Sequence, residues 1–298
     1  LTIASIILGV LLGGQLIAPT ISSFLLAFDF PFIDTGVTTP PDAAISVLVL
    51  IYAIAAWINT RIPLTGVAMR PLPRNLFSLL PDFRSCNRRL WDDKLGQISL
   101  ATTTLFWGVS GNLRYIVLAW AAAALGYGVT QASSLVGVVA IGTAAGAVLA
   151  SMRMRLDMAP RVMPLGIVMG LLVIALIFVR DLWVAVPFLI VLGAIGGFMV
   201  VPMNALLQHR GHNLMGAGRS IAVQNFNEQA CILGFGFLYS LSTKWGLSAF
   251  GAITGFGLIV AATMWLIQRW YRSNLQRYPK EVEALLTLAR EDKSHNHH

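Results

Sequence analysis

An arginine stands within an otherwise apolar stretch of the chain, TTLFWGVSGNLRYIVLAW. A charged side chain at the centre of a membrane costs about 2.5–3.5 kcal/mol on insertion scales, so Arg114 is expected to face a cavity or a partner. Its planar guanidinium can donate two hydrogen bonds at once to a phosphate. Helical spacing brings Trp107, Ser110 and Gly111 to the same face, which predicts a receptor for an anionic head group. An internal ion pair that holds helices together is the alternative.

An acidic residue, Glu228, stands in a second apolar stretch, GAGRSIAVQNFNEQ. Gln224 and Asn225 precede it by four and three residues, which predicts that all three side chains share one face and point into a helix bundle. They are candidates for contacts with a substrate amine or a glycerol hydroxyl. The sequence leaves three alternatives open: a pair with Arg114, an interhelical hydrogen-bond network, and proton coupling through Glu228.

A third group of candidate residues lies in the stretch GGFMVVPMNALLQHRG. Asn204 and Gln208 are four residues apart and are predicted to share a face, where they are further candidates for substrate contacts. Gly196 and Gly197 allow helices to approach closely, while Pro202 frees a backbone carbonyl and permits a kink. We assign these last three residues to gating or packing, because glycine and proline often interrupt transporter helices.

The composition of the chain is that of a membrane protein. Of its 298 residues, 56% are hydrophobic and only 11% are charged, whereas about 25% are charged in a typical soluble domain. The apolar runs are unbroken, so we predict an all-α membrane protein with about eight transmembrane helices of the length that crosses the hydrocarbon core. The predicted segments are Leu1–Phe28, Ala43–Ile58, Ile98–Leu125, Ala132–Met152, Val162–Val179, Leu182–Leu207, Ile221–Ser242 and Trp245–Ile267.

Basic residues are distributed unevenly between alternate loops. Most of the 21 Lys and Arg residues lie in the linker 59–97, in the loops 153–161 and 208–219, and in the tail. The opposite loops hold only Arg180 and Lys244. By the positive-inside rule, both termini of this chain are predicted to be cytoplasmic. The net charge of +8 is therefore interpreted as a topology signal, and no nucleic-acid partner is expected.

The basic linker divides the predicted spans into two before it and six after it. Six helices form one half of the major facilitator fold, in which two halves flank a central site. We therefore predict the last two helices of a first half at 1–58, a cytoplasmic linker at 59–97 and a complete second half at 98–271, in a sequence truncated at its N-terminus.

The tail, 272–298, carries a helical pattern after Pro279. A short amphipathic helix is predicted there, lying on the inner membrane surface. Its apolar face would hold Val282, Leu285, Leu286 and Ala289.

Motifs for catalysis and metal binding are missing from the sequence. It contains no GxxxxGK[ST] phosphate loop and no HExxH, CxxC or G-x-S-x-G motif. Cys86 and Cys231 lie far apart and fit no metal or redox spacing. We therefore expect no enzymatic activity, no cofactor and no metal.

Four stretches of the chain share a pattern with known proteins: LWDDKLGQ, TTLFWGVSGNLRY, GGFMVVPMNALLQHRG and GAGRSIAVQNFNEQ. Through about residues 90–270, the sequence resembles the bacterial lysophospholipid transporter (LplT) family of the major facilitator superfamily. The resemblance implies a flippase that moves lysophosphatidylethanolamine and lysophosphatidylglycerol to the inner leaflet of the bacterial inner membrane without ATP. It also implies an acyltransferase/acyl-carrier-protein synthetase as a partner, which re-acylates these lipids.

Two other functions remain as alternatives. One is a major facilitator transporter of another amphipathic or organic-anion substrate. The other is a non-transporting membrane scaffold that docks an acyltransferase through its basic linker or tail.

Overall fold

A computed structural model describes residues 40–61 and 78–291 of the chain. The chain divides into two compact units after Leu76, and each unit is described by itself. The first contains helix α3 (Pro40–Asn59), which matches the segment predicted at 43–58. The segment predicted at 1–28 lies outside the described residues.

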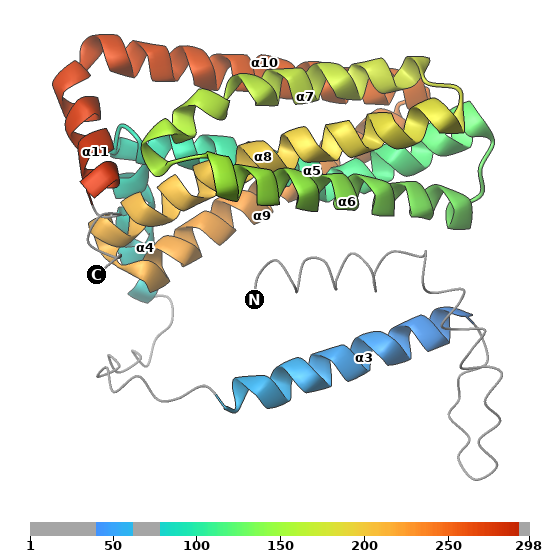
Figure 1. Cartoon of the computed structure of the whole chain (residues 1–298), viewed down its shortest axis with the longest axis horizontal. Coiled ribbons are helices and arrows are strands. Elements are labelled where there is room, and N and C mark those ends of the chain that lie inside the picture. Colours follow the sequence, from blue (N-terminus) through green and yellow to red (C-terminus); the bar gives the residue numbers. More distant parts are fainter. Residues whose placement is uncertain (1–39, 62–77, 292–298) are drawn as a thin grey trace. The chain divides into compact units, whose positions relative to one another are not determined.

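The second unit is helical throughout its described residues, in which no strand occurs. Its long helices correspond to the six segments predicted after the linker, and they lie alongside one another in a bundle (Figure 1). The fifth predicted span is the most irregular, because a short α-helix is flanked there by two 3₁₀ helices. The elements are α5 (Gly96–Leu125), α6 (Val129–Arg153), η2 (Leu156–Val162), α7 (Pro164–Ala175), η3 (Leu176–Phe178), α8 (Leu182–Met215), α9 (Ala217–Lys244) and α10 (Ala249–Arg277).

Four helical stretches of this unit are both long and apolar enough to cross a membrane: Gln131–Arg153, Leu156–Phe178, Leu182–Met215 and Ala249–Arg277. Helices α5 and α9 contain 30 and 28 residues. At 1.5 Å per residue, they also exceed the hydrocarbon thickness of about 30 Å. Both helices contain a charged residue within their apolar sequence: α5 contains Arg114 and α9 contains Glu228.

Helices α6 and α8 form the most extensive contact between described elements. Glycines line this contact on both sides. A Cβ added at Gly142 of α6 would meet the carbonyl oxygen of Ile190, and one added at Gly197 of α8 would meet that of Thr143. Gly146 is enclosed in the same way. The missing side chains let the two backbones approach closely, as small residues do in membrane helix pairs.

Gly197→Ala should therefore lower the melting temperature of the chain in detergent, although alanine is the better helix former. Overpacking a helix contact costs about 1–3 kcal/mol, whereas replacing a helical glycine by alanine gains roughly 1 kcal/mol. Gly234 of α9 is a matched control, because a Cβ there meets nothing within 4 Å. Gly234→Ala should leave the melting temperature unchanged or raise it, and equal stability of the two variants would contradict the close contact.

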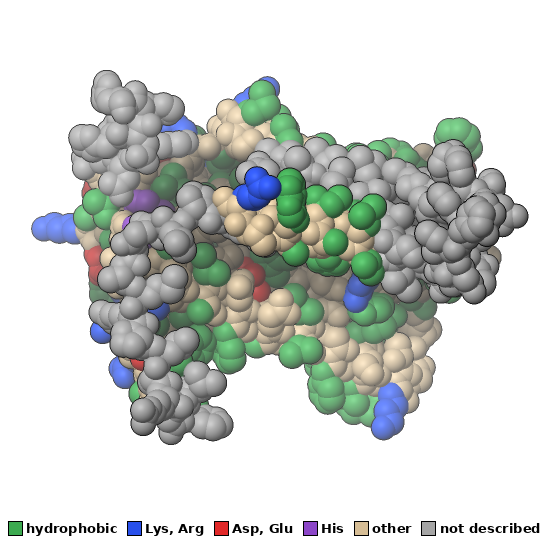
Figure 2. All heavy atoms as spheres, turned by 90° about the horizontal axis from the view of Figure 1, so that it is seen from below, with side chains coloured by type: hydrophobic (Ala, Val, Ile, Leu, Met, Phe, Trp, Pro, Cys, Tyr) green, Lys and Arg blue, Asp and Glu red, His purple; other side chains and the backbone are tan. Residues whose placement is uncertain are grey.

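Two short helices, α4 (Leu79–Asp92) and α11 (Pro279–Glu291), lie at the same end of the bundle (Figure 1). Charged and histidine side chains gather at this end (Figure 2). Helix α4 was not predicted, because its residues were assigned to the linker. It buries Cys86 and Leu90 in a small core with Leu207 and Val223, and the spacing of Phe83, Cys86 and Leu90 is the signal that indicated an amphipathic helix.

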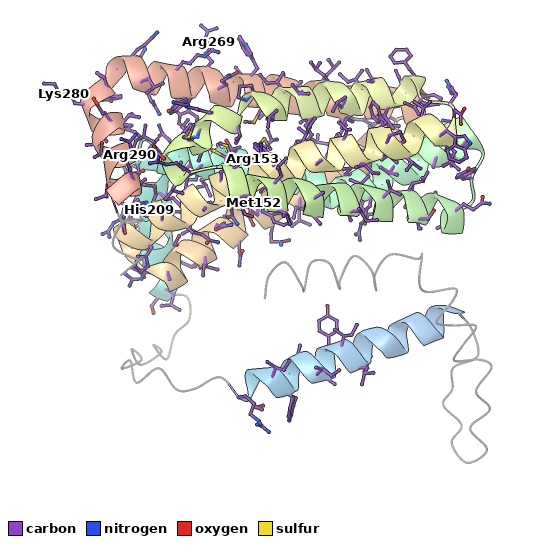
Figure 3. The ribbon with its side chains drawn as sticks, viewed as in Figure 1. Met152, Arg153, His209, Arg269, Lys280 and Arg290 are labelled. Carbon is purple, nitrogen blue, oxygen red and sulfur yellow. The ribbon has the colours of Figure 1, made fainter. Side chains whose placement is uncertain are left out.

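Helix α11 confirms that the tail contains an amphipathic helix. Part of its apolar face packs on the protein, and its position on the membrane surface stays a prediction. Val282 and Ala289 are fully buried in the main core of the unit. Arg290 adds an ion pair to Asp157 of η2, with 3.1 Å between Nη2 and Oδ2. Figure 3 shows α11 next to the end of α10 and labels Lys280 and Arg290 on it. Because protein already covers these apolar positions, they are not available to lipid.

Candidate functional site

Arg114 has an exposed side chain on α5, and Trp107 is exposed on the same face. Ser110 and Gly111 lie between them and are half-buried. The Nη2 atom of Arg114 donates a hydrogen bond to the hydroxyl of Tyr115 over 2.7 Å. The guanidinium carbon lies 4.7 Å from the centre of the Tyr115 ring. The four residues predicted to share a face thus occupy a less buried side of α5.

Tyr115 also connects this part of α5 to α9. Its ring stacks on that of Tyr239, with 6.5 Å between the ring centres. Nearer the start of both helices, the Asn112 side chain donates a hydrogen bond to the carbonyl oxygen of Ile232 over 3.0 Å. The paired residue numbers increase together, so α5 and α9 run in the same direction.

The register of α5 and α9 separates Arg114 from Glu228 along the bundle. A Cβ added at Gly111 would contact Ile232, so these two residues lie level with each other. Arg114 follows Gly111 by three residues, whereas Glu228 precedes Ile232 by four, which places the two charged residues about 10 Å apart along the helix axes. An ion pair between Arg114 and Glu228, one of the alternatives from the sequence, is therefore not among the described contacts. Arg114 contacts Tyr115 instead.

Gln224 is the centre of a polar network between α8 and α9. Its amide nitrogen donates hydrogen bonds to Asn204 Oδ1 over 2.7 Å and to Glu228 Oε1 over 2.8 Å. Gln224 and Glu228 are buried, and Asn204 is half-buried. The geometry is that of the interhelical hydrogen-bond network, one of the alternatives left open for Glu228. Such partners are needed because polar groups away from water are costly when unpaired.

Two other candidate residues, on the same two helices as this network, have exposed side chains. Asn225 is exposed on α9, and Gln208 is exposed on α8 one turn beyond Asn204. Successive helical residues are rotated by about 100°, so Asn225 leaves the buried side that Gln224 occupies. The predicted common face therefore holds for Gln224 and Glu228 but not for Asn225.

Gln224→Leu should destabilise the chain, because it removes the donor from two acceptors at once. Leaving a buried polar group without a partner costs about 1–3 kcal/mol. Asn225→Leu is the matched control, since that side chain is exposed on the next position of the same helix. Thermal unfolding in detergent should show a clear loss only for Gln224→Leu. A similar melting temperature for both variants would argue against the network.

The three residues assigned to gating or packing lie close together on α8. Gly197 faces α6 in the contact described above, and a Cβ at Gly196 would lie 3.1 Å from the ring of Phe106. Both glycines thus lie in packed contacts. Pro202 is buried, and α8 continues through it. Proline lacks an N–H, so the carbonyl of Phe198, four residues earlier, loses its usual helical donor.

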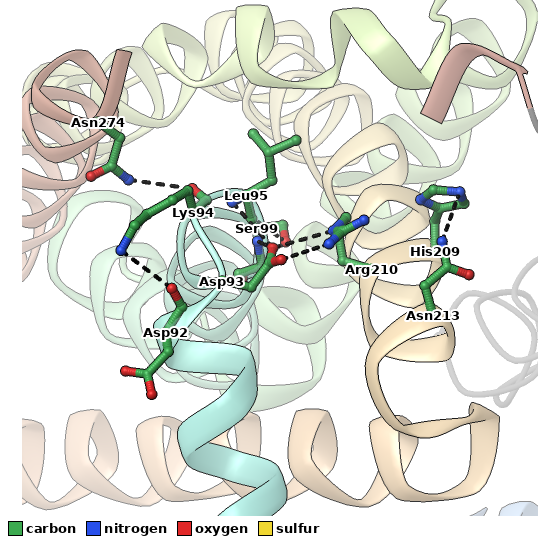
Figure 4. Close-up of polar contacts among 10 residues, drawn as sticks. Asp92, Asp93, Lys94, Leu95, Ser99, His209, Arg210, Asn213 and Asn274 are labelled. Atoms are coloured by element: carbon green, nitrogen blue, oxygen red, sulfur yellow. Dashed lines mark hydrogen bonds and ion pairs between the residues drawn. The ribbon is translucent and has the colours of Figure 1, made fainter. Parts of the chain in front are cut away.

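A buried ion pair at the α4–α11 end of the bundle was not predicted (Figure 4). Arg210 of α8 contacts Asp93 at two points, with 2.6 Å from Nη2 to Oδ2 and 3.2 Å from Nε to Oδ1. The two side chains are only 5% and 8% exposed. Asp93 Oδ1 also accepts the backbone N–H of Gly96 over 2.6 Å, at the first residue of α5. Asp93 thus caps α5 and holds it to α8.

From the sequence, Arg210 was assigned only to the basic loop 208–219. The available signal for a cap was an aspartate in LWDDKLGQ, five residues before the predicted segment and three before the observed start of α5. No comparable signal identified its partner, because Arg210 follows Asp93 by 117 residues.

The described helices, with four stretches able to cross a membrane, define an all-α membrane protein. No protein-family model and no solved structure matches the chain. Curated bacterial proteins named lysophospholipid transporter LplT do match it. The protein of Photorhabdus laumondii is 36% identical over 234 residues, which cover 77% of this chain and 59% of that protein. The protein of Pectobacterium carotovorum is 38% identical, over 69% of this chain and 51% of its own length.

A third relative, from Yersinia pestis, is 38% identical over 68% of this chain and 50% of its own length. The chain is therefore a homologue of the bacterial lysophospholipid transporter family, which confirms the resemblance seen in the sequence. It spans between half and three fifths of the length of these relatives.

Proposed function

We propose that this chain forms part of a lysophospholipid transporter in which Arg114 binds the lipid phosphate. The observation that carries the proposal is an exposed guanidinium on a long bundle helix, in a chain whose relatives are named lysophospholipid transporters. An arginine within the membrane is stable where it faces water or an anionic partner rather than lipid tails. Tyr115 engages one guanidinium nitrogen, and the other N–H donors can bind phosphate oxygens.

The Asn204–Gln224–Glu228 network provides a second polar position, about 10 Å from Arg114 along the bundle. Its internal hydrogen bonds hold the carboxylate in place. The exposed amides of Asn225 and Gln208 are the side chains that we assign to the glycerol hydroxyl or the head-group amine. Trp107 and Ser110 line the approach on α5.

The proposed architecture is that of a major facilitator transporter. Six spans, corresponding to α5–α10, make residues 98–271 one complete half, and residues 1–58 contribute to the other half. Long helices alongside one another support this assignment (Figure 1). Within this half, we assign the face of α5 that carries Arg114 to the substrate site.

The proposed orientation places the end with α4 and α11 in the cytoplasm of a bacterium, with the protein in the inner membrane. The excess of basic residues at this end supports it. The chain is then a flippase without enzymatic activity. An acyltransferase on the cytoplasmic side would consume the delivered lipid.

The proposal is tested by measuring lipid translocation in proteoliposomes that contain the transporter of which the chain forms part. Fluorescent lysophosphatidylethanolamine added outside should become protected from dithionite faster than in protein-free vesicles. Unlabelled lysophosphatidylglycerol should slow this protection, whereas a water-soluble organic anion should not. Protection at the protein-free rate, or competition by the organic anion alone, would contradict the proposal.

A further inference from the structure

Tyr239 of α9 is connected to the candidate phosphate site through a second tyrosine. Its ring stacks on that of Tyr115, with 6.5 Å between the ring centres and 21° between the ring planes. The hydroxyl of Tyr115 accepts a hydrogen bond from Arg114, and the guanidinium lies over the same ring. The contacts therefore run from Tyr239 on α9, through Tyr115, to the guanidinium on α5.

A close contact between α9 and α5 fixes the position of Tyr239. Cys231, Phe235 and Tyr239 follow one another at intervals of four residues, so their side chains lie on one face of α9. A Cβ added at Gly108 of α5 would meet both Cys231 and Phe235, which shows that this face lies against α5 with little free space. Tyr239 is the next residue along the face, and its side chain is half-buried. Its ring is therefore held by a packed part of the bundle.

Arg114 and Tyr115 are less restrained by their own helix, because both side chains are exposed on α5. Tyr115 exposes 44% of its surface. A long arginine side chain loses rotamer freedom when it binds a ligand, and ordering it in advance reduces that cost. The stack on Tyr239 holds the ring of Tyr115, and the hydroxyl of that ring holds one nitrogen of the guanidinium. The remaining N–H donors are left for phosphate oxygens.

We propose that Tyr239 is a positioning residue: it acts through Tyr115 and fixes the guanidinium of Arg114 in the orientation that binds the lipid phosphate. This inference rests on the proposed function. It gives α9 a part in phosphate binding that Glu228 of the same helix does not provide, because Glu228 lies about 10 Å from Arg114 along the helix axes. The effect of Tyr239 requires an arginine, since only a planar fork has an orientation to fix.

The test measures transport of lysophosphatidylethanolamine against its concentration, in proteoliposomes that contain the transporter of which the chain forms part. Tyr239→Leu should raise the apparent KM roughly three- to tenfold, the size of effect that one aromatic pair produces, and leave kcat unchanged. Tyr239→Phe keeps the ring and should keep the original KM. Phe237→Leu is the matched control, because that aromatic side chain is exposed on the same helix, and it should also keep the original KM.

Variants at Arg114 separate positioning from a general effect on folding. In the Arg114→Lys background, Tyr239→Leu should change the KM by less than about twofold, because an ammonium group has no fork to orient, whereas a purely structural role would cost the same in both backgrounds. The same fold-change in both backgrounds, or equal KM values for Tyr239→Leu and Tyr239→Phe, would overturn the proposal. Normal transport by Arg114→Gln would overturn both this proposal and the assigned phosphate site. A loss in Arg114→Gln with an unchanged KM in Tyr239→Leu would overturn this proposal alone.

Discussion

Arg210→Met should destabilise the bundle by about 3–5 kcal/mol, the usual cost of removing one partner from a buried ion pair. The substitution keeps a long side chain at the same position but leaves the carboxylate of Asp93 without a cation, in a place where both side chains are at most 8% exposed. Asp93 still accepts the N–H of Gly96, which is too little to balance a desolvated charge. Unfolding of the purified chain in detergent, followed by circular dichroism, measures the loss.

A second substitution separates the charge effect from the packing effect. Asp93→Asn in the Arg210→Met background should restore most of the lost stability. Asparagine removes the buried charge, and its side-chain oxygen can still accept the N–H of Gly96 at the start of α5. A double-mutant cycle over the two positions then gives their coupling energy.

The matched control is Arg290→Met, which breaks the ion pair to Asp157. The Arg290 side chain is 64% exposed, and exposed pairs contribute roughly 0–1 kcal/mol. Equal losses of stability for Arg210→Met and Arg290→Met would show that the pair at Asp93 is not the buried contact described.

Arg114→Gln should reduce lysophospholipid transport by roughly 10- to 100-fold and leave stability almost unchanged. A hydrogen bond to a charged group contributes about 1.5–3 kcal/mol, and each 1.4 kcal/mol is a factor of about ten. Because the side chain is exposed on α5, its replacement creates no cavity. Uptake of labelled lysophosphatidylethanolamine by spheroplasts that express the protein measures the effect, with the amount of protein determined in parallel.

Arg269→Gln is the control for this prediction. Arg269 is also exposed and also lies over an aromatic ring, 5.6 Å from the centre of Trp265, but it is on α10. Its replacement should leave uptake unchanged. Arg114→Lys should fall between the two, because lysine keeps the charge and loses the planar fork that matches phosphate. Normal uptake by Arg114→Gln would remove Arg114 from the proposed site.

Much of the helical framework could be predicted from the sequence because it follows from apolar length. Unbroken hydrophobic runs located α5 to α10, and the structure extended several of them by a few residues, as at α8, which continues to Met215. Helix α4 was missed because three apolar positions among arginines read as a charged linker. The spacing of Phe83, Cys86 and Leu90 was the available signal, but the residues that cover this face, Leu207 and Val223, lie far away in sequence.

The site was predicted only in part, because residue spacing does not show which side of a helix faces the protein interior. Spacing brought Gln224 and Glu228 together correctly, because residues four apart are nearly in line. It could not tell which side of α9 is buried, and therefore placed Asn225 with them. The tail shows the same limit: an amphipathic pattern predicts a helix with an apolar face, but whether lipid or protein covers Val282 and Ala289 depends on the elements nearby.

The pairing of α5 with α9 also has a consequence for biosynthesis. Asn112 bonds to Ile232, which lies 120 residues later in the chain. At about 5–20 residues per second, a ribosome needs roughly 6–24 s to make that interval. Throughout this time α5 is in the membrane without its partner, while Asn112 lacks the Ile232 carbonyl and Arg114 lacks the tyrosine stack that α9 completes. The helix that carries the proposed phosphate-binding arginine therefore reaches its full set of contacts only after α9 is made.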